Sequence, residues 1–377
     1  MLYLDNAATS YPKPESVYKE LDGYLQREGA NPGRGNYQFA YQTEKTIEDT
    51  RFLAGQFFGM SDHHRVIFTL NGTDSLNIAI KGIVQPGDHV ITSLLEHNSV
   101  SRPLKQLEEN QVITLTQIPF STEGFVDPND FRKAITSRTR LISLLHASNV
   151  LGTIQPITEV GKICRENNLL FLVDAAQTAG IIPIDMSTSH IDLLACPGHK
   201  SLLGPTGIGL LLIGDRASLS PWREGGTGTN SENPRQPKEL PYLLESGTPN
   251  TLGIAGLRAG MQFVIREGFD KIRSHDQKLL SQLITMLREK KQCQLYGSLD
   301  IDLRVGSLAV NWKNYTSSEV GAILDESFQI AVRSGLHCAP YVHRSLKTAP
   351  EGLIRISPGY FNTMEDIYEC CEALDQL

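Results

Sequence analysis

The chain has 377 residues, of which 40% are hydrophobic and 20% charged, and its formal net charge is −7. This composition is typical of a globular protein, and the length predicts a large domain together with a smaller one. The acidic charge argues against a nucleic-acid partner, and the lack of a signal peptide or a long apolar segment predicts a cytoplasmic protein outside the membrane.

Between residues 66 and 213, short runs rich in Val, Ile and Leu alternate with segments of helical periodicity. The runs are VIFTL (66–70), HVITSLL (89–95), QVITLTQI (111–118), LISLLHA (141–147), LLFLVDA (169–175), IDLLACP (191–197) and GIGLLLI (207–213). Helical patterns fill residues 73–84, 98–110 and 157–167. Nearly continuous apolar strands with helices between them predict an α/β fold with a mostly parallel, seven-stranded sheet flanked by helices.

Polar or Gly-rich residues follow five of these runs. They are residues 71–74, 96–98, 148–149, 174–177 and 197–200. In open α/β sheets, ligands bind beyond the carboxyl ends of the strands. We therefore expect the functional site to be built from these segments.

After residue 215 the pattern changes to a long Gly/Asn/Pro/Glu stretch, GGTGTNSENPRQPKELPYLLESGTPNT, which predicts an active-site or subunit-contact loop. Apolar helical spacing over residues 254–291 then predicts one long helix that opens a smaller α+β domain. We expect an N-terminal arm (1–14) that contributes to the small domain and the active site, a large domain (15–253) and a small domain (254–377). The six cysteines include no CxxC pair, so they predict neither a zinc site nor a disulfide framework, and Cys370 and Cys371 fit a partly buried helix.

Four side chains at the strand ends suit a cofactor that has a phosphate, a pyridine ring and an aldehyde. Thr73 lies at the start of a predicted helix, where free N–H groups favour an anion, although a helix cap explains this residue better when it is taken alone. Asp174 ends an apolar strand, where a carboxylate needs a partner such as a protonated pyridine nitrogen, and Gln177 is one helical turn away. Lys200 follows a buried strand, where desolvation would lower its pKa and make it a usable amine.

The order of the motifs is more specific than any single residue. The segments NGTDSLN, EHNS, SNVLGTIQPI, VDAAQTAG, GHKSLLGPTGIGLL and ESGTPNT follow one another as in the cysteine desulfurases, which belong to the class V aminotransferase branch of fold-type I pyridoxal-5′-phosphate (PLP) enzymes. The sequence resembles this family from LDNAAT at residue 4 to ISPGYFNT ending at residue 363. The VDxxQ and GHK segments are the most specific parts.

The resemblance implies how the ring of PLP would be held. Lys200 would carry the cofactor covalently, Asp174 would pair with the pyridinium nitrogen, and Gln177 would contact the phenolic oxygen. His97 would stack on the ring and count among the catalytic residues.

The resemblance also implies a phosphate site formed by Gly72, Thr73 and His199. Thr248 would reach the phosphate bound to a neighbouring subunit, so the active unit would be a homodimer. Family members carry a serine two residues before the histidine of GHK. Here that position is Pro197, which has no hydroxyl to offer the phosphate.

Substrate residues follow in the same way. Arg355, in LIRISPGY, would pair with the substrate carboxylate, a task suited to a bidentate guanidinium. Asn149, Arg333 and Ala7 would lie near the substrate. Cys338, in VRSGLHCAPYVH, matches the desulfurase segment that carries the nucleophile, and its loop resembles the compact loop of the group II enzymes. His337, His343 and Arg333 near it in sequence would favour a reactive thiolate.

These assignments predict a cysteine desulfurase that converts L-cysteine to L-alanine, leaves a persulfide on Cys338 and passes the sulfur to an acceptor, such as a dedicated protein. The alternatives are a selenocysteine lyase acting on L-selenocysteine, a cystine C–S lyase, or an epimerase or aminotransferase of the same branch. A sulfur-transfer partner with weak turnover of its own is a further alternative. A non-catalytic binding module is disfavoured because all of these residues occur together.

Overall fold

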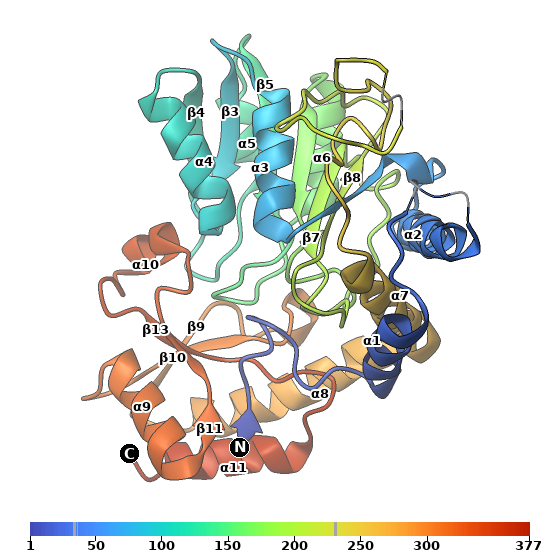
Figure 1. Cartoon of the computed structure of the whole chain (residues 1–377). Coiled ribbons are helices and arrows are strands. Elements are labelled where there is room, and N and C mark those ends of the chain that lie inside the picture. Colours follow the sequence, from blue (N-terminus) through green and yellow to red (C-terminus); the bar gives the residue numbers. More distant parts are fainter. Residues whose placement is uncertain (33–34, 36, 230–231) are drawn as a thin grey trace.

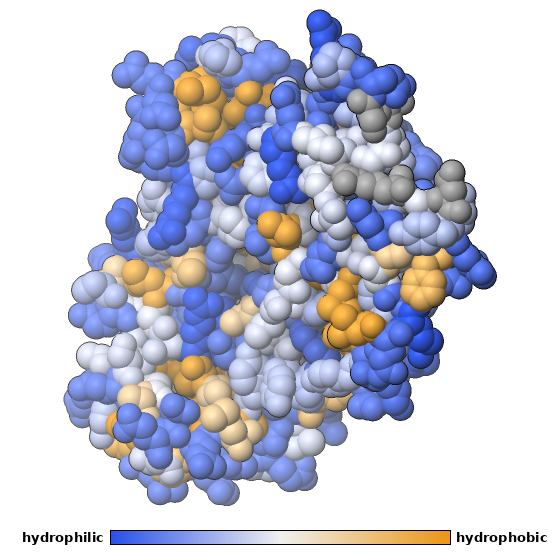
Figure 2. All heavy atoms as spheres, in the orientation of Figure 1, coloured by the Kyte–Doolittle hydropathy of each residue, from blue (hydrophilic) through white to orange (hydrophobic). Residues whose placement is uncertain are grey.

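A computed structural model of the chain describes residues 1–32, 35, 37–229 and 232–377. Its largest element is a seven-stranded sheet with helices on both sides, and a smaller four-stranded sheet lies next to it (Figure 1). The N-terminal segment passes between the two sheets, close to elements from the end of the chain. The face seen in Figure 1 is mostly hydrophilic, with small hydrophobic groups separated by polar residues (Figure 2).

Each of the seven apolar runs corresponds to one strand of the large sheet, and β5 begins two residues before its run. In spatial order these are β2 (Val66–Thr69), β8 (Gly209–Ile213), β7 (Leu193–Pro197), β6 (Leu170–Asp174), β5 (Thr139–Leu145), β3 (His89–Ser93) and β4 (Thr114–Ile118). Only β8 runs against its neighbours; the other described pairings in this sheet are parallel. The predicted fold class is therefore confirmed.

The sheet is buried on both faces because its side chains alternate between two hydrophobic clusters. Phe171 and Val173 of β6 belong to one cluster, while Leu170 and Leu172 belong to the other. The helices of this part are α1 (Glu15–Arg27), α2 (Gln38–Phe57), α3 (Gly72–Ile83), α4 (Asn98–Glu109), α5 (Pro128–Ala134), α6 (Ile157–Glu166) and the short 3-10 helix η1 (His63–Arg65). Among the described residues, no helix is both long and apolar enough to cross a bilayer.

The smaller sheet is antiparallel and has the order β12-β13-β10-β9. Its register places Arg333 directly opposite Arg355, so the two arginines extend from the same face. The strands and helices of this part are β9 (Cys293–Tyr296), β10 (Leu308–Trp312), β11 (Ile330–Ala331), β12 (Arg333–Gly335), β13 (Leu353–Ile356), α9 (Ser317–Phe328), α10 (Pro340–Leu346), α11 (Met364–Leu374) and the 3-10 helix η2 (Ile301–Leu303). The N-terminal strand β1 (Leu2–Tyr3) pairs with β11 in parallel. Cys370 and Cys371 lie on the buried side of α11, whose other positions include exposed ones, so the predicted partly buried helix is confirmed.

The prediction of a single helix over residues 254–291 is wrong. Two helices occupy this segment, α7 (Thr251–Glu267) and α8 (Phe269–Arg288), and Gly268 separates them with φ +83° and ψ 141°. Residues other than glycine rarely adopt this backbone conformation, so Gly268 can end one helix and begin the next. The long polar segment before α7 contains no helix or strand over its described residues 214–229 and 232–250, and Asn230 and Ser231 lie outside the described residues. The three-part division of the chain stays a prediction.

Replacing Gly268 by alanine should lower the free energy of unfolding by about 1–3 kcal/mol, because alanine disfavours that backbone conformation. Space is not the cause, since a Cβ atom there would meet no atom within 4 Å. Urea denaturation followed by circular dichroism would measure the change. Gly55→Ala is the matched control: it lies inside α2, where a Cβ atom makes only ordinary contacts, and it should stabilise slightly. Equal effects of the two changes would contradict the prediction.

Candidate active site

One pocket lies beyond the carboxyl ends of the parallel strands, where the sheet faces the β12–β13 hairpin. All residues predicted for the site line this pocket except Cys338 and Thr248, namely Ala7, Gly72, Thr73, His97, Asn149, Asp174, Gln177, His199, Lys200, Arg333 and Arg355. Asn71, of the expected segment 71–74, also lines the pocket, and sequence reasoning missed other lining residues, among them Ser99 and Ala147. Ser99 belongs to the EHNS segment, so its motif could have indicated it.

Asp174 ends β6 and is almost completely buried. Its carboxylate accepts a hydrogen bond from the backbone N–H of Ala176 at 2.9 Å, and no cation lies within ion-pair distance in the described part of the chain. Burial raises the pKa of this carboxyl, while the Ala176 N–H and the charge of Lys200 oppose the rise. A buried carboxylate with so few partners is suited to bind a cationic ligand atom.

Lys200 lies in a turn that follows β7, with its amine in the same pocket as Asp174. Burial and the nearby Arg355 lower the pKa of this amine to about 8, and Asp174 partly offsets them. An amine with this pKa is partly neutral near pH 8, as a nucleophile must be.

The capture of PLP by the cofactor-free protein should therefore accelerate as the pH rises through about 8. Below that value Lys200 is an ammonium ion that cannot attack an aldehyde, and above it the free amine predominates. Stopped-flow absorbance from pH 6.5 to 10 would measure the rate. A rate that kept rising to the ordinary lysine range above pH 10 would show that the pKa is not lowered.

His97, Ser99 and Thr73 form a hydrogen-bonded chain at one side of the pocket. His97 precedes α4, and its Nδ1 accepts from the backbone N–H of Ser99 at 3.1 Å, which leaves a proton for Nε2. The Ser99 hydroxyl lies 2.8 Å from His97 Nδ1 and 2.7 Å from the Thr73 hydroxyl. Burial, followed by the charges of Lys200 and Arg333, lowers the pKa of His97 to about 4, so the ring is neutral near pH 7.

Thr73 is the second residue of α3 rather than its cap. The side chain of Asn71 caps this helix by accepting from the N–H of Asp74 at 2.9 Å. Asn71 therefore fills the role of helix cap that was considered for Thr73. The Thr73 hydroxyl lies beside the free N–H groups of the first turn. Gln177 lies in hydrogen-bonded turns after β6 rather than in a helix, and its amide donates to the Ala7 carbonyl at 3.1 Å.

Arg355 and Asn149 connect the two sheets. Arg355 is 1% exposed, and its Nη1 donates to the Asn149 carbonyl at 2.9 Å. Its Nη2 donates to Asp5 Oδ1 at 2.6 Å. Burial lowers the pKa of Arg355, and the pairing with Asp5 opposes this. Two arginines from facing strands thus bring positive charge to the pocket, which suits a carboxylate ligand.

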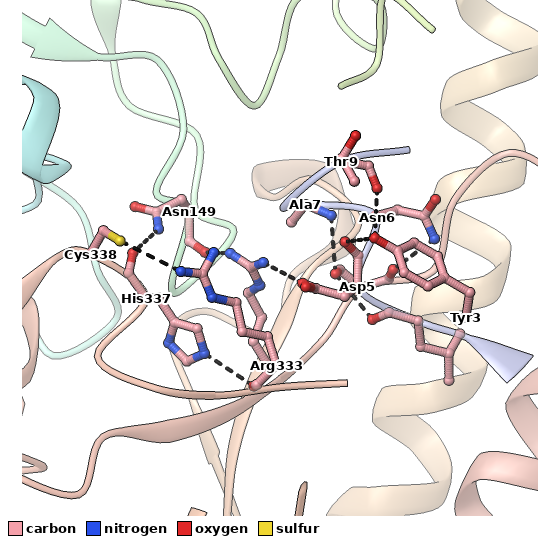
Figure 3. Close-up of polar contacts among 12 residues, drawn as sticks. Tyr3, Asp5, Asn6, Ala7, Thr9, Asn149, Arg333, His337 and Cys338 are labelled. Carbon is pink, nitrogen blue, oxygen red and sulfur yellow. Dashed lines mark hydrogen bonds and ion pairs between the residues drawn. The ribbon is translucent and has the colours of Figure 1, made fainter. Parts of the chain in front are cut away.

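Cys338 does not line the pocket but lies beside it, on the loop between β12 and α10. Its Sγ is 3.5 Å from Arg333 Nη2, and Figure 3 shows the two side chains in contact. Two asparagines from strand ends of the large sheet hold the loop: Asn149 Nδ2 donates to the His337 carbonyl and Asn98 N–H to the Cys338 carbonyl, both at 2.7 Å. His337 and Cys338 both have positive φ values, of 48° and 56°. The thiol is therefore held on a defined turn next to a guanidinium.

The two neighbouring histidines do not contact the thiol in any described hydrogen bond. His337 Nε2 donates to the Arg333 carbonyl at 3.1 Å, and His343 Nδ1 lies 2.9 Å from the Thr348 hydroxyl. Burial, more than any other cause, lowers the pKa of His337 to about 3 and that of His343 to about 4, so both are neutral near pH 7. Arg333 is the positive charge that faces Cys338.

Thr248 is exposed and lines a different cleft, together with Tyr41, Arg51 and Thr227. The structure therefore does not bring Thr248 to the pocket of its own chain.

Comparisons with known proteins agree with this geometry. The family model described as aminotransferase class-V matches residues 2–369. The chain belongs to this family. A probable cysteine desulfurase of Methanothermobacter thermautotrophicus is 33% identical over 100% of this chain and 94% of that protein. A cysteine desulfurase of Salmonella agona is 30% identical over 97% of this chain and 91% of that protein.

A solved structure shows the same fold. The apo structure of a cysteine desulfurase from Thermococcus onnurineus NA1 superposes with a TM-score of 0.93 at 32% identity, covering 100% of this chain and 94% of that one. The chain is thus a class V aminotransferase-type enzyme with cysteine desulfurases as relatives, and PLP is the cofactor of these families.

Proposed function

We propose that this chain is a PLP-dependent cysteine desulfurase that converts L-cysteine to L-alanine and retains the sulfur as a persulfide on Cys338. The observation that carries the proposal is the position of Cys338 Sγ, 3.5 Å from an arginine that lines the same pocket as Lys200. A thiol, an amine of lowered pKa and two guanidiniums are the groups that this reaction needs.

The residues of the pocket fit PLP. Asp174 is a buried carboxylate that has no ion-pair partner among the described residues, which suits the pyridinium nitrogen, and Gln177 would contact the phenolic oxygen. His97 would stack on the ring, and Lys200 would carry the cofactor. Gly72, Thr73 and His199 would hold the phosphate, since the buried Nδ1 atom of His199 has no hydrogen-bond partner in the described part of the chain and α3 offers free N–H groups. Bound there, PLP supplies an electron sink for the charge that develops at the substrate Cα.

The reaction then follows from the chain's own groups. Arg355 and Arg333 bind the α-carboxylate of L-cysteine, and Lys200, free as an amine, removes the Cα proton. The Cys338 thiolate attacks the substrate sulfur: an S–S bond forms while the Cβ–S bond breaks, and its electron pair stays with the carbon fragment. Protons return to the carbon fragment, which leaves as alanine. Arg333 Nη2 faces the Cys338 sulfur at 3.5 Å, and the neutral His97 and His337 add no further charge.

We further propose a homodimer in which Thr248 reaches the cofactor phosphate of the partner subunit. Thr248 is exposed and remote from its own pocket, and α2, next to its cleft, exposes Phe39, Tyr41 and Phe52 to solvent. Exposed aromatic side chains on one helix suit a subunit interface. The compact loop of Cys338, which ends in the short helix α10, suits a dedicated protein acceptor for the sulfur.

The proposed reaction is tested by incubating the purified protein with L-cysteine and L-selenocysteine separately, and by measuring alanine and the mass of the Cys338 peptide. Alanine with one added sulfur on that peptide is expected from L-cysteine. Pyruvate with ammonia would indicate elimination, and a keto acid that forms only with an amino acceptor would indicate transamination. Alanine from L-selenocysteine alone would indicate a selenocysteine lyase.

A further inference from the structure

Residues 3–13 of the N-terminal arm contact both halves of the candidate site. The arm leaves β1, passes Arg355 on the small sheet and continues to the Lys200 turn of the large sheet. The arm as a whole was predicted to contribute to the active site, and Ala7 was its one residue named individually. Figure 3 shows several of its polar contacts in the same view as Arg333 and Cys338.

One end of the arm holds Arg355. Asp5 accepts from Arg355 Nη2 at 2.6 Å, and this pair is 1% and 19% exposed at its two side chains. The backbone of Asp5 is held next to the end of β13, because Asp5 forms a parallel bridge with Ser357. The N–H of Asn6 also donates to the Ser357 carbonyl at 3.0 Å. The Ala7 N–H donates to the Ser357 hydroxyl at 3.1 Å. A charge-assisted contact on such a fixed backbone restricts the guanidinium strongly.

The other end of the arm holds the turn that carries Lys200. Four donors lie within hydrogen-bond distance of the His199 carbonyl: the Ser10 N–H at 3.1 Å, the Thr9 and Ser10 hydroxyls at 3.1 and 3.2 Å, and the Lys13 ammonium at 2.6 Å. The Ser10 hydroxyl is also 2.9 Å from the Lys200 carbonyl. This turn has no helix or strand of its own, so these contacts position it.

The side chain of Tyr3 bridges two points of the arm: its hydroxyl lies 3.0 Å from the Asp5 carbonyl and 2.9 Å from the Thr9 carbonyl. Since a hydroxyl has one proton, it can donate to both carbonyls only as a shared hydrogen bond. This contact joins the Arg355 end to the Lys200 end within one short segment. The arm therefore links the proposed carboxylate contact to the proposed cofactor lysine.

We propose that Asp5 is a positioning residue that aims the Arg355 guanidinium at the α-carboxylate of the amino-acid substrate. This inference rests on the proposed function. Arg355 lines the pocket whereas Asp5 does not, so Asp5 acts through Arg355 and not on the substrate. Arg355 Nη2 donates to Asp5 and Nη1 donates to the Asn149 carbonyl, and these two hydrogen bonds fix the plane of the guanidinium. Each of the two nitrogens keeps a second proton that can be donated to a carboxylate.

The test compares Asp5→Asn and Asp5→Ala with the wild-type holoenzyme. We expect KM for L-cysteine to rise about tenfold in Asp5→Asn and further in Asp5→Ala, while kcat at saturation changes far less, because binding is lost more than chemistry. Propionate, which has a carboxylate but no amine to react, should bind more weakly by a similar factor in calorimetry. A KM that is unchanged or lower in both variants would overturn the proposal, as would a loss confined to kcat.

Two controls separate positioning from other effects. Asp130→Asn removes one negative charge from an exposed pair with Lys133 and should leave KM and propionate binding unchanged. In an Arg355→Lys background, adding Asp5→Asn should cause no further loss, since the group that Asp5 positions is gone. An equal additional loss in that background would overturn the proposal.

Failure of this inference and failure of the proposed function can be told apart. Propionate binding requires no turnover, so it reports on Asp5 and Arg355 even if the protein makes no alanine. If alanine and the persulfide form but Asp5→Asn binds propionate like the wild type, the function stands and the role of Asp5 is wrong.

Discussion

Replacing Cys338 by serine should lower alanine formation from L-cysteine by about a thousandfold or more, because a hydroxyl is a far weaker nucleophile toward sulfur than a thiolate. The serine variant should still bind the cofactor, since Cys338 does not line the cofactor pocket. It should also still bind L-cysteine, because Arg355 and Arg333 are unchanged. The measurements are alanine by chromatography and the visible spectrum of the variant before and after L-cysteine is added.

Cys293→Ser provides the matched control. Cys293 is also partly exposed, but it lies in β9 and does not line the candidate site. This variant should retain activity. If Cys338→Ser formed alanine and sulfide at the wild-type rate, the persulfide mechanism would be wrong even with the cofactor in place.

Much of the cofactor pocket could be predicted because its residues follow directly from sheet geometry. Apolar runs mark the strands, and parallel strands bring their carboxyl ends to one edge, so Asp174, Lys200 and His97 converge although they are far apart in sequence. Local signals were less complete. The sequence indicated a polar helix start near Thr73, but the choice of Asn71 as the cap depends on the backbone of that turn.

The substrate side was harder to predict because it depends on long-range pairing. The facing positions of Arg333 and Arg355 come from the register of β12 and β13, which no local pattern specifies. The contact between Asp5 and Arg355 joins the two ends of the chain. The break at Gly268 was missed since a single glycine is compatible with helical periodicity until its φ is known.

The two sheets contribute different chemistry. The large sheet supplies Asp174, Lys200 and His97, which hold and use the cofactor in the proposed mechanism, and the small sheet supplies the arginines and the Cys338 loop. Asn98 and Asn149 connect the Cys338 loop to the large sheet. The distance between the amine and the thiol thus depends on how the two sheets are held together, so residues outside the pocket can affect the reaction.

Replacing Lys200 by alanine should abolish covalent capture of PLP and lower the desulfuration of L-cysteine by about a thousandfold or more, since one side chain both carries the cofactor and moves the Cα proton. Borohydride reduction followed by peptide mass spectrometry should label the Lys200 peptide in the wild type and leave it unlabelled in the variant. PLP that remains bound through Asp174 and the phosphate site should be removed by dialysis.

Lys200→Arg separates the amine from its charge. Arginine keeps a cation beside Asp174 but cannot lose its proton in the accessible pH range, so this variant should be as inactive as Lys200→Ala. Lys133→Ala, at an exposed position on α5, controls for loss of a lysine and should leave labelling and activity unchanged. A Lys200→Ala protein that was still labelled covalently elsewhere and still made alanine would refute the assignment. If instead both Lys200 variants lose label and activity together, the Lys200 amine both carries the cofactor and is required for turnover.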